Sequence, residues 1–383
     1  MTRALFVSVV LAAVACGSDP TSESAATASM IAPGSSPTNL SMSAAPTPSA
    51  ATTSSAGPAD GLPPGRAACE VEYDPQALPD ADTESKTLAD QREAMIGRMK
   101  VMLNLDDAVA QKIRDIFGRS KMAGQGNPET TKHPMSRSEC VEKRRTQGIR
   151  DERERLCASP FMVPIFDATA RKEDAAVCID RYEFPGLPCE YPATWVTASA
   201  AAELCGTLGK RLCDAHEWEG ACAGDLRPIG EEYDFTLNRD SMSAVQNGKR
   251  KITWAYGEKK DHAKCGTNST KSKECTASGW KCGSNTYPAG AFPECKSAFG
   301  VYDQHGNAAE HMLLPLRKAD LGSSGGKGVA EMKGSWFIFQ KHEAHKDDCR
   351  WRANSWHDDE GLNHANYHLG FRCCKDIRPL KSP

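Results

Sequence analysis

Sixteen cysteines in a chain of 383 residues are the feature that most restricts how this protein can fold. A cytosolic protein of this size rarely carries so many unless they bind zinc or iron–sulfur clusters. In an exported protein, the same number indicates a framework of disulfides instead. The N-terminal residues therefore decide between the two interpretations.

The first sixteen residues resemble a bacterial lipoprotein signal peptide. Arg3 supplies a positive charge, and residues 4–14 form an apolar stretch that is too short to span a membrane as a helix. Residues 13–16, Ala-Val-Ala-Cys, then resemble a lipobox, which makes Cys16 the lipidated N-terminus. An ordinary signal peptide cleaved nearby is the alternative. In both cases we expect export, and in the first case a lipid anchor in the cell envelope, at the outer membrane or cell surface.

Residues 17–66 are dominated by Ser, Thr, Ala, Pro and Gly and contain no aromatic residue. Such a segment cannot bury enough apolar surface to offset its loss of conformational entropy, so we expect a disordered linker. The whole chain has a net charge of -3, which gives no electrostatic indication of nucleic-acid binding.

Residues 67–155 predict a small helical segment. Apolar residues recur at helical spacing within 83–103 and again within 109–117, where Gly118 ends the pattern. A shorter helix is expected over 136–145. Nothing in these residues indicates catalysis, so we expect the segment to pack on the main domain or to contact a partner.

Residues 156–377 form the main domain, in which Gly, Trp and Cys are frequent and helical patterns are short. The pattern over 197–208 predicts one helix with Thr197 as its N-cap. Asp214 and Glu217 form a capping box that begins a second helix. Long irregular stretches follow, and these need disulfides or metal ions to hold them in place.

Five motifs along this domain together resemble one known family. They are CIDRYE at 178–183, GKRLCDAHEWE at 209–219, FGVYDQHGNAAE at 299–310, KGSW at 333–336 and LGFRC at 369–373. In this order they resemble the formylglycine-generating enzymes, also called sulfatase-modifying factors. The resemblance implies an α+β, loop-rich fold that is related to C-type lectins.

The resemblance also identifies a departure from the family's chemistry. Formylglycine-generating enzymes oxidise a substrate cysteine with oxygen and a copper ion that two cysteines hold, because thiolates suit the soft Cu(I) ion. Ile338 stands where the first of these cysteines is expected, and only Cys349 matches the second. With one thiolate the copper site is incomplete, so we do not expect the family's oxidase activity.

Cys349 itself has two interpretations. We expect a structural disulfide, with Cys373 or Cys374 as the partner, and the alternative is a free catalytic thiol. Once Cys16 is set aside, fifteen cysteines remain, and an odd number cannot all pair within one molecule. At least one of them is therefore free, modified or intermolecular, and the adjacent Cys373 and Cys374 are expected to have different partners.

A structural calcium site is a further implication of the resemblance. Carried over to this sequence, Asp303 and Glu310 supply carboxylate oxygens, while Gly306 and Ala308 supply backbone carbonyls. Several oxygens at this spacing suit a hard cation. The role of the ion would be to order loops that have little core of their own.

Histidines and tryptophans provide the remaining candidates. Seven of the ten histidines lie between 305 and 368, which leaves an imidazole-bound iron as an alternative, but the His-x3-His-x-Glu motif of the iron-dependent relatives is missing from the sequence. We expect most of these histidines to be loop and surface residues. By analogy with the family, Trp336, Trp351 and Trp356 would line a ligand groove.

Together these observations predict a lipid-anchored exported protein whose sulfatase-modifying-factor-like domain serves as a binding or assembly module. Its partner would be a peptide, a glycan or another envelope protein. The alternative is an oxidoreductase that acts on protein cysteine by formylglycine-generating chemistry, or that performs another metal-dependent oxidation.

Overall fold

The computed structural model describes residues 85–151, 154–322 and 328–377. The predicted signal peptide with Cys16 and the predicted linker 17–66 lie outside the described residues. All described residues belong to the same compact unit. Within them, the helices are too short or too polar to cross a membrane.

The predicted helical segment is confirmed over its described part. It forms α1 (Leu88–Leu103), α2 (Asp107–Gly118) and α3 (Arg137–Thr146). Asn104 ends α1 in the left-handed conformation, and the side chain of Asp106 then caps α2, so one short turn joins the two helices. Their apolar faces share a buried cluster with the following domain, through residues such as Met95, Ile113 and Leu204.

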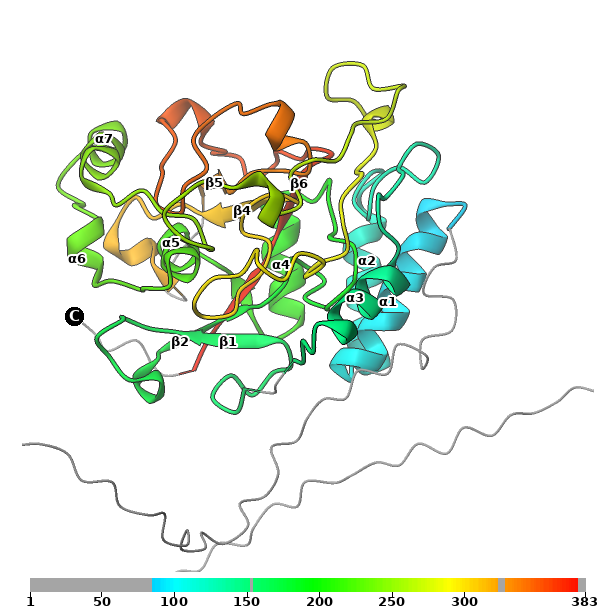
Figure 1. The fold of residues 1–383 in the computed structure, drawn as a ribbon, viewed down its shortest axis with the longest axis horizontal. Helices are drawn as coiled ribbons and strands as arrows, with labels where there is room; N and C mark the ends of the chain where they lie inside the picture. The colour runs from blue at the N-terminus through cyan, green and yellow to red at the C-terminus, as the bar shows by residue number, and fades with distance from the viewer. Residues whose placement is uncertain (1–84, 152–153, 323–327, 378–383) are drawn as a thin grey trace, which may run out of the picture. The chain divides into compact units, whose positions relative to one another are not determined.

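Two small sheets form the centre of the main domain. The first has the antiparallel order β1-β2-β7-β3, with β1 (Met162–Ile165), β2 (Val177–Asp180), β3 (Arg211–Leu212) and β7 (Cys373–Asp376). The second has the order β5-β4-β6, with β4 (Ala309–Leu313), β5 (Ala330–Lys333) and β6 (Leu369–Phe371), as Figure 1 shows. Only Arg372 separates β6 from β7, so one segment connects both sheets.

Helices cover the two faces of the first sheet. The helices of this domain are α4 (Ala198–Thr207), α5 (Ala215–Ala223), α6 (Ile229–Glu232) and α7 (Arg239–Lys249). The predicted caps are confirmed: Thr197 caps α4, and the capping box of Asp214 and Glu217 begins α5. Because neighbouring strand residues point to opposite faces, Cys373 packs in the cluster with α4 and Cys374 in the cluster with α5. The mixed α+β fold class predicted from the sequence is therefore confirmed.

Among the described residues, seven disulfides connect α3 and segments of the main domain. The pairs are Cys140–Cys189, Cys157–Cys178, Cys205–Cys373, Cys213–Cys374, Cys222–Cys349, Cys265–Cys295 and Cys275–Cys282. These pairs include all cysteines of the described residues, and Cys16 and Cys69 lie outside that part of the chain. So many disulfides indicate that the protein is not cytoplasmic.

The expected partner of Cys349 is wrong. Cys349 pairs with Cys222 on α5, and not with Cys373 or Cys374. The reason is the position of β7, which lies between β2 and β3 and directs its two cysteines to Cys205 and Cys213. The expectation that the adjacent cysteines have different partners is confirmed.

Helix α7 lies in a stretch where the sequence predicted irregular structure. Its buried residues are Met242, Ser243 and Gln246, whereas the apolar Val245 is half exposed. Two of these three buried side chains are polar, so apolar residues alone do not mark the buried face of the helix.

Candidate functional site

Cys349 lies in a buried cluster with a second cysteine and a histidine. Its disulfide partner Cys222 is the penultimate residue of α5. His305 Nε2 is 3.3 Å from Cys222 Sγ and 3.7 Å from Cys349 Sγ. All three side chains are almost completely buried, so the two sulfur atoms and the imidazole are close together and shielded from solvent.

His305 is held as a neutral imidazole. Burial lowers its pKa to about 4, although the carboxylates of Asp347 and Asp348 act in the opposite direction. The backbone N–H of Ala255 donates a hydrogen bond of 3.0 Å to Nε2, which makes this nitrogen an acceptor. The Ala255 N–H occupies the lone pair of Nε2, so this nitrogen could ligate a metal ion only if that hydrogen bond were broken.

Ile338 occupies the position that the family resemblance assigns to a copper-binding cysteine. The side chain is buried in a cluster with Trp336, Phe337, Phe339 and Tyr367. This environment is mainly aromatic, and its buried sulfur atom, that of Cys282, is bonded to Cys275. The two positions that the resemblance assigns to copper ligands therefore hold an aliphatic side chain and a sulfur that is bonded to another sulfur.

A cleft of about 440 Å³ lies beside this aromatic cluster. Trp351 and Trp356 line the cleft together with His345 and His357. The rings of His345 and Trp351 are parallel, with centroids 5.0 Å apart, and Trp356 is 74% exposed beside His357. The cleft thus presents several aromatic surfaces, including an exposed indole at its rim.

Trp336 does not line this cleft but lies behind it. Its indole stacks on His368 with a centroid distance of 4.8 Å and contacts His345 at 5.6 Å. Among the described residues, Trp336 Nε1, His345 Nε2 and His368 Nδ1 are buried atoms without a hydrogen-bond partner. Burial lowers the pKa of His368 to about 3, so this ring is neutral.

The loop predicted to bind calcium contains one incompletely bonded carboxylate. Asp303 has a left-handed backbone conformation, and its Oδ2 accepts a hydrogen bond of 2.6 Å from the Gly290 N–H. Asp303 Oδ1 is buried and has no partner among the described residues. Burial raises the pKa of Asp303 to about 7, and the charge of Glu310 adds to this effect.

Glu310 and Glu183 surround Asp303 with further negative charge. Both oxygens of Glu310 accept from the Arg372 guanidinium, and Oε2 also accepts from the indole N–H of Trp218 at 3.0 Å. Glu183 is buried, and burial together with Asp303 and Glu310 raises its pKa well above the usual range. Both oxygens of Glu183 and of Glu310 have donors, so within the described residues Asp303 Oδ1 is the carboxylate oxygen of this group that is left for a hard cation.

Gly306 and Ala308 shape the same loop. The N–H of Gly306 donates to Ser335 Oγ at 2.9 Å, and the N–H of Ala308 donates to Glu183 Oε1 at 2.7 Å. A Cβ at position 306 would lie 2.7 Å from the backbone of Gly266, so only glycine fits there.

The structure does not gather the C-terminal histidines into a metal site. Among the described residues, the groups of three ligand atoms that lie within 4.8 Å of one another are Cys222, His305 and Cys349, and Cys213, Glu217 and Cys374. His364 and His368 are not on a helix, so their spacing of four does not place them on one face.

Sequence reasoning missed the role of Cys222 and the position of His305 beside it. Cys222 is 83 residues from His305 and 127 residues from Cys349. No local pattern indicates such a contact. The one feature of the sequence that could have pointed to His305 is its position within a family motif, GVYDQHGN. In the structure this motif forms a buried loop.

Comparisons with known proteins agree with the family that the order of the motifs predicts. The sequence model of the sulfatase-modifying factor enzyme 1-like domain matches residues 169–377, which is more than half of the chain. No curated protein matches the sequence significantly. One similar solved structure, "Crystal Structure of CarF", is 14% identical, with a TM-score of 0.30, and the alignment covers 57% of this chain and 98% of that one. Another, "Major Tropism Determinant I1 Variant", is also 14% identical, with a TM-score of 0.26 and coverages of 57% and 55%.

Proposed function

Because the chain belongs to the sulfatase-modifying factor enzyme 1-like family, we propose that it uses the family domain as a binding or assembly module rather than as an oxidase. In this proposal the lipobox at Cys16 anchors the exported protein to the cell envelope, and the linker 17–66 carries the domain away from the membrane. The ligand is a peptide, a glycan or another envelope protein.

The observation that carries the proposal is the state of the family's copper-binding positions. Ile338 offers no ligand atom, and Cys349 is tied to Cys222. Cu(I) prefers soft ligands such as thiolates in low coordination, and a disulfide sulfur is a much weaker donor than a thiolate. As long as this disulfide is intact, the protein lacks both thiolates of the family's reaction.

The aromatic cleft supports a binding role. Exposed tryptophans are frequent anchors of protein interfaces, because one indole contributes a large contact area at a small loss of side-chain entropy. Trp356 is the most exposed large hydrophobic residue among the described residues, and it lies at the rim of the cleft that Trp351 and His345 line. We place the ligand contact at this rim.

Calcium belongs to the same proposal as a structural ion. Asp303 Oδ1, which is buried and has no partner within the described part of the chain, supports it, as does the negative charge of Glu183 and Glu310 nearby. Asp303 and Glu310 would hold the ion, which would neutralise these carboxylates and order the loop around them.

Two measurements on the mature protein, purified without reductant, test the oxidase part. A non-reducing peptide map after alkylation should contain the Cys222–Cys349 linkage at full occupancy. Incubation with Cu(I), oxygen and a cysteine-containing peptide should produce no formylglycine. Copper-dependent conversion that is lost in Cys349→Ser would overturn the proposal.

The binding part is tested by site-specific crosslinking in the envelope. A photo-crosslinking residue at position 356 should give a discrete adduct, and one at the less exposed surface residue Leu316 should not. The absence of adducts at position 356 under all growth conditions would contradict a binding role of this cleft.

A second function, a thiol-dependent oxidoreductase, is favoured by the cluster of Cys222, His305 and Cys349. Reduction of the disulfide by a dithiol transfers two electrons and two protons and yields two thiols. Their thiolates and the imidazole would form a ligand set for a soft ion, and copper supplies oxygen activation in this family. If mild reduction creates a copper-binding protein that oxidises peptide cysteine, and Cys222→Ser abolishes both properties, this function replaces the proposed one.

A further inference from the structure

A pocket of about 430 Å³ lies between the last turn of α3 and two loops of the main domain. Three of the residues that line it are lysines: Lys143 on α3, and Lys264 and Lys296 on the two loops. We call it the lysine pocket. It is separate from the aromatic cleft and from the cluster around Cys349.

A disulfide holds two of the three lysines close together. Lys264 directly precedes Cys265, and Lys296 directly follows Cys295, the disulfide partner of Cys265. The Cα atoms of the two cysteines are 4.9 Å apart, although the cysteines are separated by 30 residues in the sequence. The covalent structure therefore keeps two positive charges on neighbouring loops, where their mutual repulsion cannot separate them.

The three ammonium groups share one kind of contact, because each lies over the face of an aromatic ring. The distances from Nζ to the ring centroid are 4.9 Å for Lys143 and Phe292, 5.7 Å for Lys264 and Tyr256, and 5.6 Å for Lys296 and Tyr302. A ring face attracts a cation without neutralising its charge. The rings thus help to position the ammonium groups and leave their charge available to an anion.

The lining of the lysine pocket has an excess of positive charge. Glu294 is its acidic residue, and the carboxylate is 4.0 Å from Lys264 Nζ on a side chain that is 73% exposed, so this ion pair is weak. Within the described part of the chain, Lys143 and Lys296 form no ion pair. Three ammonium groups against one carboxylate leave two positive charges, in a protein whose net charge is -3. A pocket of this kind concentrates anions.

The C-terminal end of α3 does not cancel this charge. The backbone carbonyls of residues 143–145 accept hydrogen bonds from the N–H groups of residues 147–149. Because these carbonyls are bonded, the negative end of the helix dipole is largely satisfied. The neighbouring Arg144 and Arg145 already pair with carboxylates, so they neither add to the lysine pocket nor compete for its ligand.

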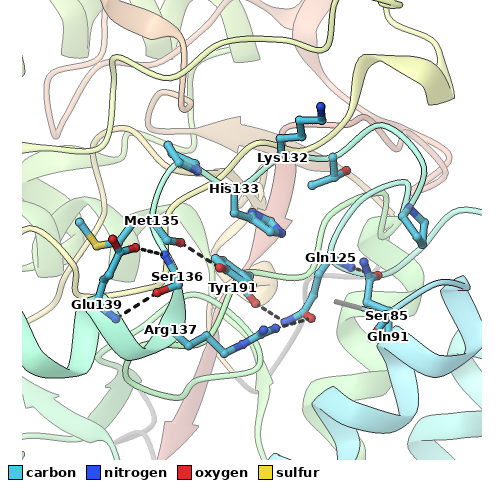
Figure 2. A pocket seen from close by; sticks show the side chains of 13 residues that line it. Ser85, Gln91, Gln125, Lys132, His133, Met135, Ser136, Arg137, Glu139 and Tyr191 are labelled. Atoms are coloured by element: carbon cyan, nitrogen blue, oxygen red, sulfur yellow. Dashed lines mark hydrogen bonds between the residues drawn. The ribbon is translucent and has the colours of Figure 1, made fainter. Parts of the chain in front are cut away.

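A pocket of about 550 Å³ beside α1 and α3 shows the opposite case (Figure 2). Its polar side chains bond to one another, as Arg137 does to Gln125 at 3.1 Å. The buried carboxylate of Glu190 forms ion pairs with both Arg98 and Arg137. The arginines of this second pocket are therefore engaged within the protein, whereas the lysine pocket presents its cations to a ligand.

From this arrangement we propose that the lysine pocket binds a phosphate monoester. At pH 7 such a group carries close to two negative charges and offers three acceptor oxygens, which match two excess positive charges and three ammonium donors. The exposed Gln147 supplies a further amide donor, and the ring of Phe292 gives the organic part of the ligand an apolar surface. The volume lies in the range of about 300–1,000 Å³ that is common for small-molecule sites. This function goes beyond the binding role proposed for the aromatic cleft.

The test is a calorimetric titration of the full mature chain with three soluble probes. They are phenyl phosphate, benzoate, which has one charge on the same ring, and dihexanoyl phosphatidic acid, an analogue of a lipid headgroup. We expect at least one phosphate to bind at least about tenfold more tightly than benzoate. Similar binding of both phosphates assigns the ligand to soluble phosphate esters, and binding of the lipid analogue alone assigns it to a headgroup.

Four variants locate the binding. Lys264→Ala and Lys296→Ala should each weaken it about fivefold, which is the effect of one unit charge about 4 Å away in water. Glu294→Gln should strengthen it by a similar factor, because the negative charge of the lining is removed. Lys112→Ala on α2 is the matched control, since it removes the same charge from an exposed position outside the lysine pocket, and it should leave binding unchanged. Circular dichroism and the melting temperature report whether each variant is folded.

Four results would each overturn the inference. They are the absence of binding of both phosphates, equal binding of benzoate, binding by folded Lys264→Ala and Lys296→Ala that equals that of the parent protein, and an equal loss in Lys112→Ala. Weaker binding by Glu294→Gln also contradicts it, because a carboxylate in the lining can only oppose an anion.

Discussion

Removal of the Cys205–Cys373 disulfide should destabilise the protein by about 3 kcal/mol, far less than its sequence separation of 168 indicates. In the chain-entropy account, the effect of a disulfide grows with the logarithm of the loop that it closes in the unfolded chain. A loop of about 170 residues corresponds to roughly 5 kcal/mol. The Cys213–Cys374 disulfide, however, joins nearly the same two segments. While it is intact, the loop that Cys205–Cys373 closes is only about 11 residues long, which corresponds to roughly 2.8 kcal/mol.

The Cys275–Cys282 disulfide, with a sequence separation of 7, is the matched comparison. Its short loop corresponds to roughly 2.5 kcal/mol. Two disulfides whose separations differ more than twentyfold should therefore stabilise the fold almost equally. The cavity that two buried sulfur atoms leave at Cys205 and Cys373 adds up to about 1 kcal/mol.

Urea denaturation without reductant, followed by circular dichroism, measures both effects. The variants are Cys205→Ala with Cys373→Ala, and Cys275→Ala with Cys282→Ala. A loss of about 5 kcal/mol or more for the first pair, beside a loss of about 2.5 kcal/mol for the second, would contradict this prediction. That result would mean that the neighbouring disulfide does not shorten the loop in the unfolded chain.

Three further predictions concern charge. Acidification from pH 7 to 4 should destabilise the fold. Burial lowers the pKa of His216 to about 4 and that of His368 to about 3 in the folded protein. In the unfolded chain both histidines take up a proton below about pH 6.5, so acid favours the unfolded state. His368→Phe should reduce the slope of the unfolding free energy against pH by up to about 1.4 kcal/mol per pH unit. An unchanged slope would contradict the lowered pKa of His368 in the folded protein. Excess Ca²⁺ should raise the melting temperature and EGTA should lower it, with no difference in Asp303→Asn; equal melting of the parent protein in both solutions would exclude the ion. Glu190→Ala leaves two arginines without a counter-ion and should destabilise the protein by about 3–5 kcal/mol in urea titrations, against less than about 1 kcal/mol for the exposed Glu203→Ala.

The local parts of the fold could be predicted from the sequence because their causes are local. Thr197 and Asp214 cap the helices that follow them, since a side-chain oxygen can reach the free N–H groups of the first turn. Helix α7 could not be predicted, because its buried face includes Ser243 and Gln246, whose burial depends on the tertiary structure.

The candidate site could likewise be predicted from the sequence only where its causes are local. The motif order predicted the family, which the comparisons confirm, whereas the loss of a copper ligand at position 338 stays a prediction. The pairing of Cys349 with Cys222 depends on the position of α5 against a loop 127 residues away, and no spacing rule indicates it.

The position of β7 at the end of the chain has a consequence for the maturation of the protein. Cys205 and Cys213 are synthesised 168 and 161 residues before their partners. Throughout that interval both thiols are present, close together and without their final partners. A bond formed between them at this stage would have to be reopened when β7 arrives. A domain whose central strand is made last therefore depends on slow oxidation, or on thiol–disulfide exchange, to reach a single covalent form.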